Sequence, residues 1–157
     1  MTKFTLFFIF FYFIFNIEGN GYAKTTRLKG INEVDLLVES LNENAEKCFI
    51  SYEKIETATK YILSNSKIKI SEKAFTPILY IKSVVTYYGN ICSVYSKITV
   101  QTFSGQDPYK LGNRGSFLYY HNDRMASGKG MSLGNVVIEQ IEEMMKELVV
   151  KHHEDNQ

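Results

Sequence analysis

His121 and Asp123 are the two residues of this sequence whose types and spacing best fit acid–base chemistry. They stand two positions apart in a stretch with alternating aromatic residues, so a strand would point both side chains to one face. A histidine paired with a carboxylate can serve as a general base when it faces a nucleophile. No nucleophile motif accompanies this pair, so a surface or half-buried strand histidine is the simpler interpretation, and no catalytic residue is assigned.

Two further groups of residues resemble sites only in part. His152 and His153 are adjacent, whereas a helical metal site favours histidines four positions apart, so residues 152–157 are predicted to be a polar tail. The segment Gly128–Ser132 has the glycines and lysine of a phosphate loop but not their order, which indicates a flexible loop over Ser127–Gly134. The sequence therefore predicts no metal site and no cofactor.

A glycine-rich segment, Ser104–Gly115, is predicted to be a loop that could bind a partner. It contains Tyr109, Lys110 and Arg114, and basic and aromatic side chains on one loop could meet a glycan, a peptide or an acidic surface. We name these three residues as the candidate binding residues. The tyrosines of the predicted strands suit a half-exposed sheet face, and they are also common at interfaces.

Cys48 and Cys92 are the only cysteines of the chain. In an oxidising compartment an isolated pair most often forms a bridge, so a Cys48–Cys92 disulfide is predicted, with two buried free thiols as the alternative. Cys92 falls on the apolar face of its predicted strand, which favours the bridge.

The first 23 residues have the pattern of a secretory signal peptide. Lys3 precedes an apolar run over residues 4–15, and the small residue Ala23 follows a polar stretch. A membrane-spanning helix needs about 20 apolar residues, which is more than this run provides. We therefore expect cleavage after Ala23 and a periplasmic or secreted protein.

The remaining chain of about 134 residues is long enough for one domain with its own core. Residues 24–30 are predicted to be a flexible lead-in, and residues 31–151 a single domain. The formal net charge of +1 predicts no strong field for nucleic acid or anionic lipid, so neither nucleic-acid binding nor stable membrane insertion after cleavage is expected.

Hydrophobic periodicity gives the expected elements of this domain. In order, these are a strand over residues 34–40, a helix opened by Ser51 and closed at residues 64–66, a short strand over residues 67–70, a hairpin over residues 77–103 that turns at residues 88–90, a strand over residues 116–126 and an amphipathic helix over residues 135–151. The first strand also fits a helical face, and its β-branched residues favour the strand. The predicted class is α+β, with a four- to five-stranded, mostly antiparallel sheet and two helices on one face.

These elements follow the layout of a group of small, uncharacterised bacterial secreted or periplasmic proteins. The resemblance lies in the segments VDLLVESL, AEKCFISYEKIETA, ILYIKSVV and CSVYSKITV and in the closing amphipathic helix. The layout is also similar to the amino-terminal domain of the Tol translocation protein. The group's usual aromatic–glycine start of the last strand is replaced here by Arg114, Gly115, Ser116 and Phe117. The resemblance implies an envelope protein and supplies no catalytic residues.

The first functional hypothesis is an exported, non-enzymatic accessory or binding domain that engages a protein or envelope component through the sheet face or the Tyr109–Arg114 loop. The alternative is a small secreted hydrolase-like enzyme that uses His121 and Asp123. A secreted inhibitor or effector is a third hypothesis, which no cysteine framework supports.

Overall fold

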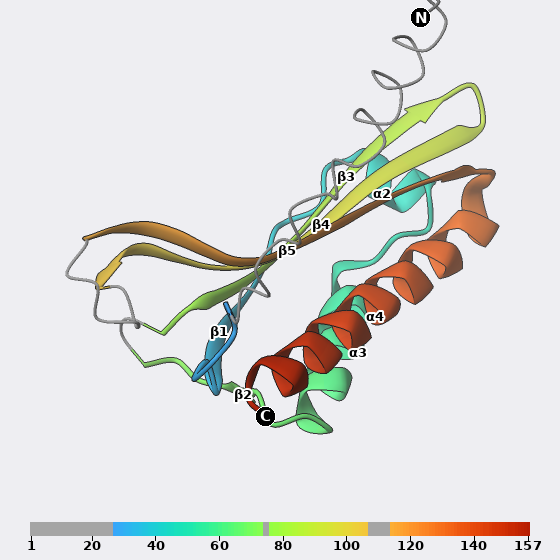
Figure 1. The fold of residues 1–157 in the computed structure, drawn as a ribbon. Helices are drawn as coiled ribbons and strands as arrows, with labels where there is room; N and C mark the ends of the chain where they lie inside the picture. Colours follow the sequence, from blue (N-terminus) through green and yellow to red (C-terminus); the bar gives the residue numbers. More distant parts are fainter. Residues whose placement is uncertain (1–26, 74–75, 107–113) are drawn as a thin grey trace, which may run out of the picture.

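The structure is a computed structural model that describes residues 27–73, 76–106 and 114–157 (Figure 1). The predicted signal peptide lies outside the described residues, as do Tyr109 and Lys110. The described elements run in the order β1 (Glu33–Val38), α2 (Asn44–Lys47), α3 (Tyr52–Ser64), β2 (Lys69–Ile70), β3 (Ile78–Tyr88), β4 (Ile91–Gln106), β5 (Arg114–Gly128) and α4 (Gly130–Asp155).

The five strands form an open sheet in the order β2-β1-β3-β4-β5. The predicted α+β class is confirmed, and the sheet is mixed, with most of its strand pairing antiparallel. Strand β1 pairs in parallel with both β2 and β3, whereas β3, β4 and β5 pair antiparallel. After β1 the chain passes through α2 and α3 and then enters β2, which runs in the same direction as β1. A helical crossover of this kind is what connects parallel strands.

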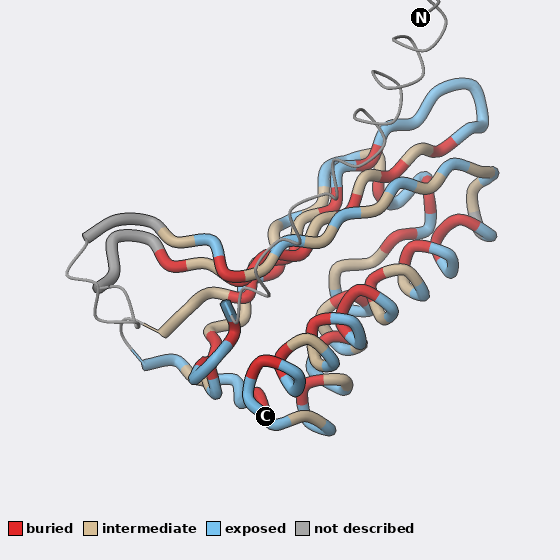
Figure 2. The backbone as a smooth tube through the Cα atoms, viewed as in Figure 1, coloured by how far each residue is buried: buried red, intermediate tan, exposed pale blue. Residues whose placement is uncertain are grey.

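Helices α3 and α4 lie side by side on one face of the sheet (Figure 1). The buried residues concentrate between this helical layer and the strands (Figure 2). Strands β3 and β4 supply alternate residues to this core, among them Leu79, Ile81, Val94 and Ile98, each at most 1% exposed. The alternation predicted for the hairpin is therefore the one that builds the core.

Local sequence signals explain where α3 and the hairpin begin and end. The Ser51 side chain caps α3 by accepting a hydrogen bond from the Lys54 main-chain N–H at 3.3 Å. Between β3 and β4, Gly89 and Asn90 have φ angles of 53° and 78°, which a tight hairpin turn requires. Both features agree with the sequence predictions.

Two predicted loops contain regular structure in their described residues. The segment Ser104–Gly115 is strand at both ends, because Gly105 pairs with Gly115 and Gln106 with Arg114. The segment Ser127–Gly134 holds the end of β5 and the first turn of α4. Within it, Gly134 packs closely against the Phe49 backbone.

The two ends of the described chain are held together rather than loose. Helix α4 continues through Asp155, so most of the predicted polar tail is helical. The buried Asp155 carboxylate accepts a hydrogen bond from the Leu28 main-chain N–H at 3.0 Å, and Asn156 accepts one from the Gly30 N–H at 2.8 Å. Leu28, in the predicted flexible lead-in, is 1% exposed. We call this arrangement the terminal clamp.

Candidate functional site

The face of the sheet opposite the helices is left uncovered by the described helices, and we call it the open face (Figure 1). Strand alternation sends every second residue of β1, β3, β4 and β5 to this face. The open face carries, among others, Leu37, Glu39, Tyr80, Lys82, Tyr95, Lys97, His121 and Asp123.

Strand register places these side chains in rows across the open face. Lys82 of β3 lies opposite Lys97 of β4, which lies opposite Asp123 of β5. Two facing lysines repel each other, but an acidic group stands at each end of this row. Lys82 contacts Glu39 at 3.1 Å between Nζ and Oε1. The row is therefore balanced in charge.

Glu39 is the best-connected residue of this row. It accepts hydrogen bonds from the Tyr80 hydroxyl and from Lys82. The Tyr80 hydrogen bond is the main cause that lowers the pKa of Glu39, and the same bond raises the pKa of Tyr80 to about 12. Glu39 is thus held as a carboxylate and Tyr80 as a phenol, so the pair is a fixed donor–acceptor contact rather than a proton-transfer site.

The structure brings His121 and Asp123 together, as their spacing predicted. The Nε2 atom of His121 lies 3.0 Å from Oδ1 of Asp123, and each side chain is 45% exposed. Asp123 also lies close to Tyr95, whose pKa is raised by burial first and by this carboxylate second. The pair therefore lies on a solvent-exposed sheet face.

A catalytic pair would also need a nucleophile held by the histidine. Thr99 stands opposite His121 in the strand register. Its hydroxyl is buried and makes no hydrogen bond within the described part of the chain. An activated hydroxyl would be hydrogen-bonded to its base. The described geometry thus supplies the histidine–carboxylate pair without the third member.

The candidate binding residues of the glycine-rich segment are not brought together by the described structure. Tyr109 and Lys110 lie outside the described residues, and Arg114 is the first residue of β5, opposite Gln106. The proposal that this segment binds a partner therefore stays a prediction.

Cys48 and Cys92 form the predicted disulfide, with their Cα atoms 5.9 Å apart. Both cysteines are fully buried, and the bond joins the end of α2 to the start of β4. Protein disulfides persist mainly in oxidising compartments, so the bond favours an extracytoplasmic location.

His152, expected in a polar tail, is 2% exposed within the terminal clamp, and its Nε2 atom has no hydrogen-bond partner there. Burial is the largest cause that lowers its pKa, against a smaller opposing effect of the Ile31 carbonyl. Across residues 27–73, 76–106 and 114–157, no three histidine, cysteine, aspartate or glutamate residues are grouped as a metal ion would need. His152 is thus a core residue.

Sequence reasoning missed the contacts that hold β5 against α4. Arg124 forms ion pairs with Glu143 and Glu147 of α4, and Glu147 also accepts a hydrogen bond from Asn122. Arg124 and Asn122 alternate with His121 and Asp123, so they point to the helical side. Strand alternation in the sequence could have assigned Asn122 and Arg124 to the helical side of β5. Their partners on α4 follow only from the tertiary fold.

Comparison with protein families found no matching family, and comparison with curated proteins found no match either. Among solved structures, the chain is similar to a minor lipoprotein from Acinetobacter baumannii with 12% sequence identity and a TM-score of 0.40. The similarity covers 78% of this chain and 91% of that protein. A shared function does not follow from a likeness at this level.

Proposed function

We propose that this protein is an exported, non-enzymatic binding or accessory domain of the cell envelope that engages a protein partner through its open face. The observation that carries the proposal is that α3 and α4 cover one face of the sheet and leave the other exposed (Figure 1). On that face Leu37 is 46% exposed beside Tyr80, and tyrosines and a charge-balanced row complete the surface. Apolar and aromatic groups among fixed polar ones are typical of a protein interface.

The compartment rests on two supports. The Cys48–Cys92 disulfide is suited to an oxidising environment, and the first 23 residues have the pattern of a secretory signal. We therefore place the mature protein in the periplasm or the external medium. The glycine-rich segment with Tyr109, Lys110 and Arg114 is a second contact region within the same proposal.

The alternative function, a hydrolase that uses His121 and Asp123, is favoured by one observation, the 3.0 Å contact between the two side chains. Two observations count against it: both side chains are exposed to solvent, and the Thr99 hydroxyl makes no hydrogen bond to His121. In our proposal the pair instead extends the polar row of the open face toward β5, where a partner's polar groups can meet it.

The proposal is tested with a photoreactive phenylalanine analogue placed at Tyr95 of the open face, in cells that produce the protein naturally. The matched control carries the same analogue at Tyr61, which is 71% exposed on α3. A discrete protein crosslink from position 95 that is missing from position 61 is expected.

A second pair of variants asks whether the open face determines that crosslink. Leu37→Ser removes an exposed apolar group from β1 of this face, whereas Val150→Ser removes one from α4. The crosslink should weaken with Leu37→Ser and persist with Val150→Ser. Equal crosslinking from positions 95 and 61, or a crosslink unaffected by Leu37→Ser, would contradict the proposal.

A further inference from the structure

Exposed apolar side chains gather at one end of the molecule, around the β3–β4 turn. Of the twelve large apolar side chains that are exposed in the described part of the chain, six lie there. We call this group the distal tip: Phe49, Val84, Tyr87, Tyr88, Ile91 and Met125. Tyr88 is 88% exposed and Met125 71%. Figure 2 shows that the turn itself is exposed to solvent.

Pairings and covalent bonds place the members of the distal tip together. Tyr88 pairs with Ile91 across the turn, and Tyr87 pairs with Cys92. The disulfide to Cys48 therefore brings the next residue, Phe49, to this end of the sheet. Tyr87, Tyr88, Ile91 and Phe49 thus lie at the same end of the sheet, with Tyr88 and Ile91 on the open face. Val84 and Met125 lie further along the open face, on either side of Tyr95.

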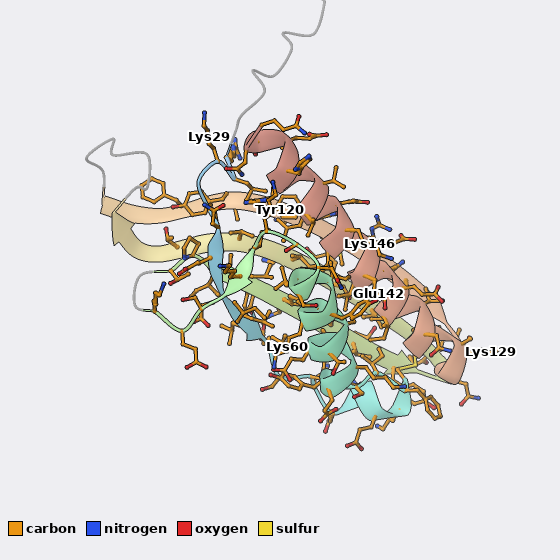
Figure 3. All side chains as sticks on the ribbon, turned by 90° about the horizontal axis from the view of Figure 1, so that it is seen from below. Lys29, Lys60, Tyr120, Lys129, Glu142 and Lys146 are labelled. Carbon is orange, nitrogen blue, oxygen red and sulfur yellow. A yellow bond between two sulfur atoms is a disulfide. The ribbon has the colours of Figure 1, made fainter. Side chains whose placement is uncertain are left out.

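The distal tip lacks charge, and lysines border it. No charged residue occurs between Lys82 and Lys97, a stretch that covers the whole outer half of the hairpin, or at residues 125–128 of β5. Lys47 places its Nζ atom 5.6 Å from the centre of the Tyr87 ring. Lys129 follows Gly128, which pairs with Cys92, and Figure 3 shows Lys129 at the start of α4.

The polar side chains within this end are already paired with one another. The Tyr87 hydroxyl donates to Asn90 at 3.2 Å, and the Ser93 and Ser127 hydroxyls lie 2.8 Å apart. The Thr86 hydroxyl donates to the Ser93 carbonyl at 3.3 Å. Moving these groups out of water would therefore leave few of them without a hydrogen bond, which lowers the cost of that transfer.

We propose that the distal tip seats reversibly in the interface of a lipid bilayer, with Tyr88 and Ile91 at the acyl boundary and Lys47 and Lys129 at the phosphates. Tyrosine is favoured at this depth because its ring is apolar and its hydroxyl is polar. Lysines can bury their stems and keep their ammonium groups at the headgroups. An uncharged end bordered by cations complements the charge layering of a bilayer, whereas a protein partner would more often meet unpaired polar groups.

This contact is peripheral. Within the described residues, no helix has the length and apolar character needed to cross a membrane. Glu43, which precedes α2, and Glu46 within it also border this end of the sheet, where they line a hollow with Ser40 and Tyr52. The proposal rests on the proposed function and deepens it by naming a second, lipid partner at the end of the sheet. Tyr95 lies between Val84 and Met125 of the tip, whereas Leu37 lies opposite Tyr80 and outside it.

The chain has no tryptophan, so a single introduced indole reports on its surroundings. Tyr88→Trp should show a shift of its emission to shorter wavelength with vesicles of phosphatidylcholine and phosphatidylglycerol, and quenching by brominated acyl chains. Tyr61 of α3 is 71% exposed, so Tyr61→Trp is the matched control. It should show neither the emission shift nor the quenching. Equal responses from both positions, or none from Tyr88→Trp, would refute the proposal.

Flotation of the exported protein with the same vesicles measures affinity. Removing two apolar groups in Tyr88→Ser/Ile91→Ser should lower vesicle binding by about a hundredfold, because each seated side chain contributes a factor of roughly ten. Tyr61→Ser/Val150→Ser should bind as the wild type does. A wild type that does not float, while the tip variant loses a protein crosslink, would assign the tip to a protein interface and overturn the lipid proposal. Leu37→Ser, at a position opposite Tyr80 and outside the tip, tests the proposed function separately.

Discussion

Gly134 of α4 should be one of the least replaceable residues of this protein, and Gly134→Ala tests how tightly α4 packs against the link between α2 and α3. A Cβ atom at position 134 would lie 2.4 Å from the carbonyl oxygen of Phe49 and 3.3 Å from the Phe49 Cβ. Phe49 itself has a φ of 59°, a left-handed conformation that costs a non-glycine residue free energy. The following helix and the Cys48–Cys92 disulfide restrict how this backbone can move away.

The expected free-energy change combines two opposing effects. Alanine is more favourable than glycine inside a helix by about 1 kcal/mol, which would stabilise the variant if there were space. Overpacking against a backbone atom costs about 3 kcal/mol when neighbouring segments must shift. Gly134→Ala should therefore lower the free energy of unfolding by about 2 kcal/mol, which for a domain of this size lowers Tm by roughly 8 °C.

Thermal and urea unfolding followed by far-ultraviolet circular dichroism measure this change. Gly128→Ala is the control, because a Cβ there would meet the Leu133 side chain at an ordinary 3.8 Å. Gly128 ends β5 only two residues before α4 begins, so the two substitutions sample the same region. The packing argument fails if Gly134→Ala is as stable as the wild type or more stable, since helix propensity alone would then explain the result.

Further predictions concern the disulfide, the terminal clamp, the histidine pair and export. The double variant Cys48→Ala/Cys92→Ala should lose about 4 kcal/mol of unfolding free energy in urea titrations, because the bridge closes a long loop; no loss would contradict this. Because the pKa of His152 is lowered below 6.5, the unfolded chain binds a proton more readily, so stability should fall as pH drops from about 7 to 5. That fall should be smaller in His152→Gln, and an equal fall would exclude His152 as its source. His121→Ala should leave the Tyr95 crosslink and the cellular phenotype nearly unchanged, whereas loss of the phenotype in a well-folded variant would favour the hydrolase alternative. Amino-terminal sequencing of the exported protein should begin at Lys24, and protein that retains residues 4–15 in the membrane would indicate a signal anchor.

Local signals were sufficient for the elements whose partners are near in sequence. The β3–β4 hairpin follows from strict alternation around Gly89 and Asn90, and the start of α3 follows from the Ser51 cap. The rows of the open face could also be anticipated within the hairpin, because its turn fixes the register that sets Lys82 opposite Lys97. These features need only information carried within about twenty residues.

Features that depend on distant partners were predicted poorly. The parallel pairing of β1 depends on where the chain returns after α3, and no residue of β1 encodes that return. Asp155 and His152 are polar residue types, so their sequence predicts exposure rather than burial. Both are buried, and Asp155 accepts a hydrogen bond from the Leu28 main chain, more than one hundred residues away in the sequence. Gly134 was assigned to a flexible loop because glycine alone does not distinguish mobility from close packing.

The terminal clamp and the distal tip lie at opposite ends of α4, so the two can be perturbed independently. The helix begins after Gly128, beside Cys92 at the tip, and ends at Asp155, which holds Leu28. Its 26 residues span about 39 Å at 1.5 Å per residue. A contact made at the tip is therefore separated from the clamp by the length of α4, so Asn156→Ala, which removes the acceptor of the Gly30 N–H, should leave the response of Tyr88→Trp to brominated lipids unchanged. Loss of that response in a folded Asn156→Ala variant would contradict this separation.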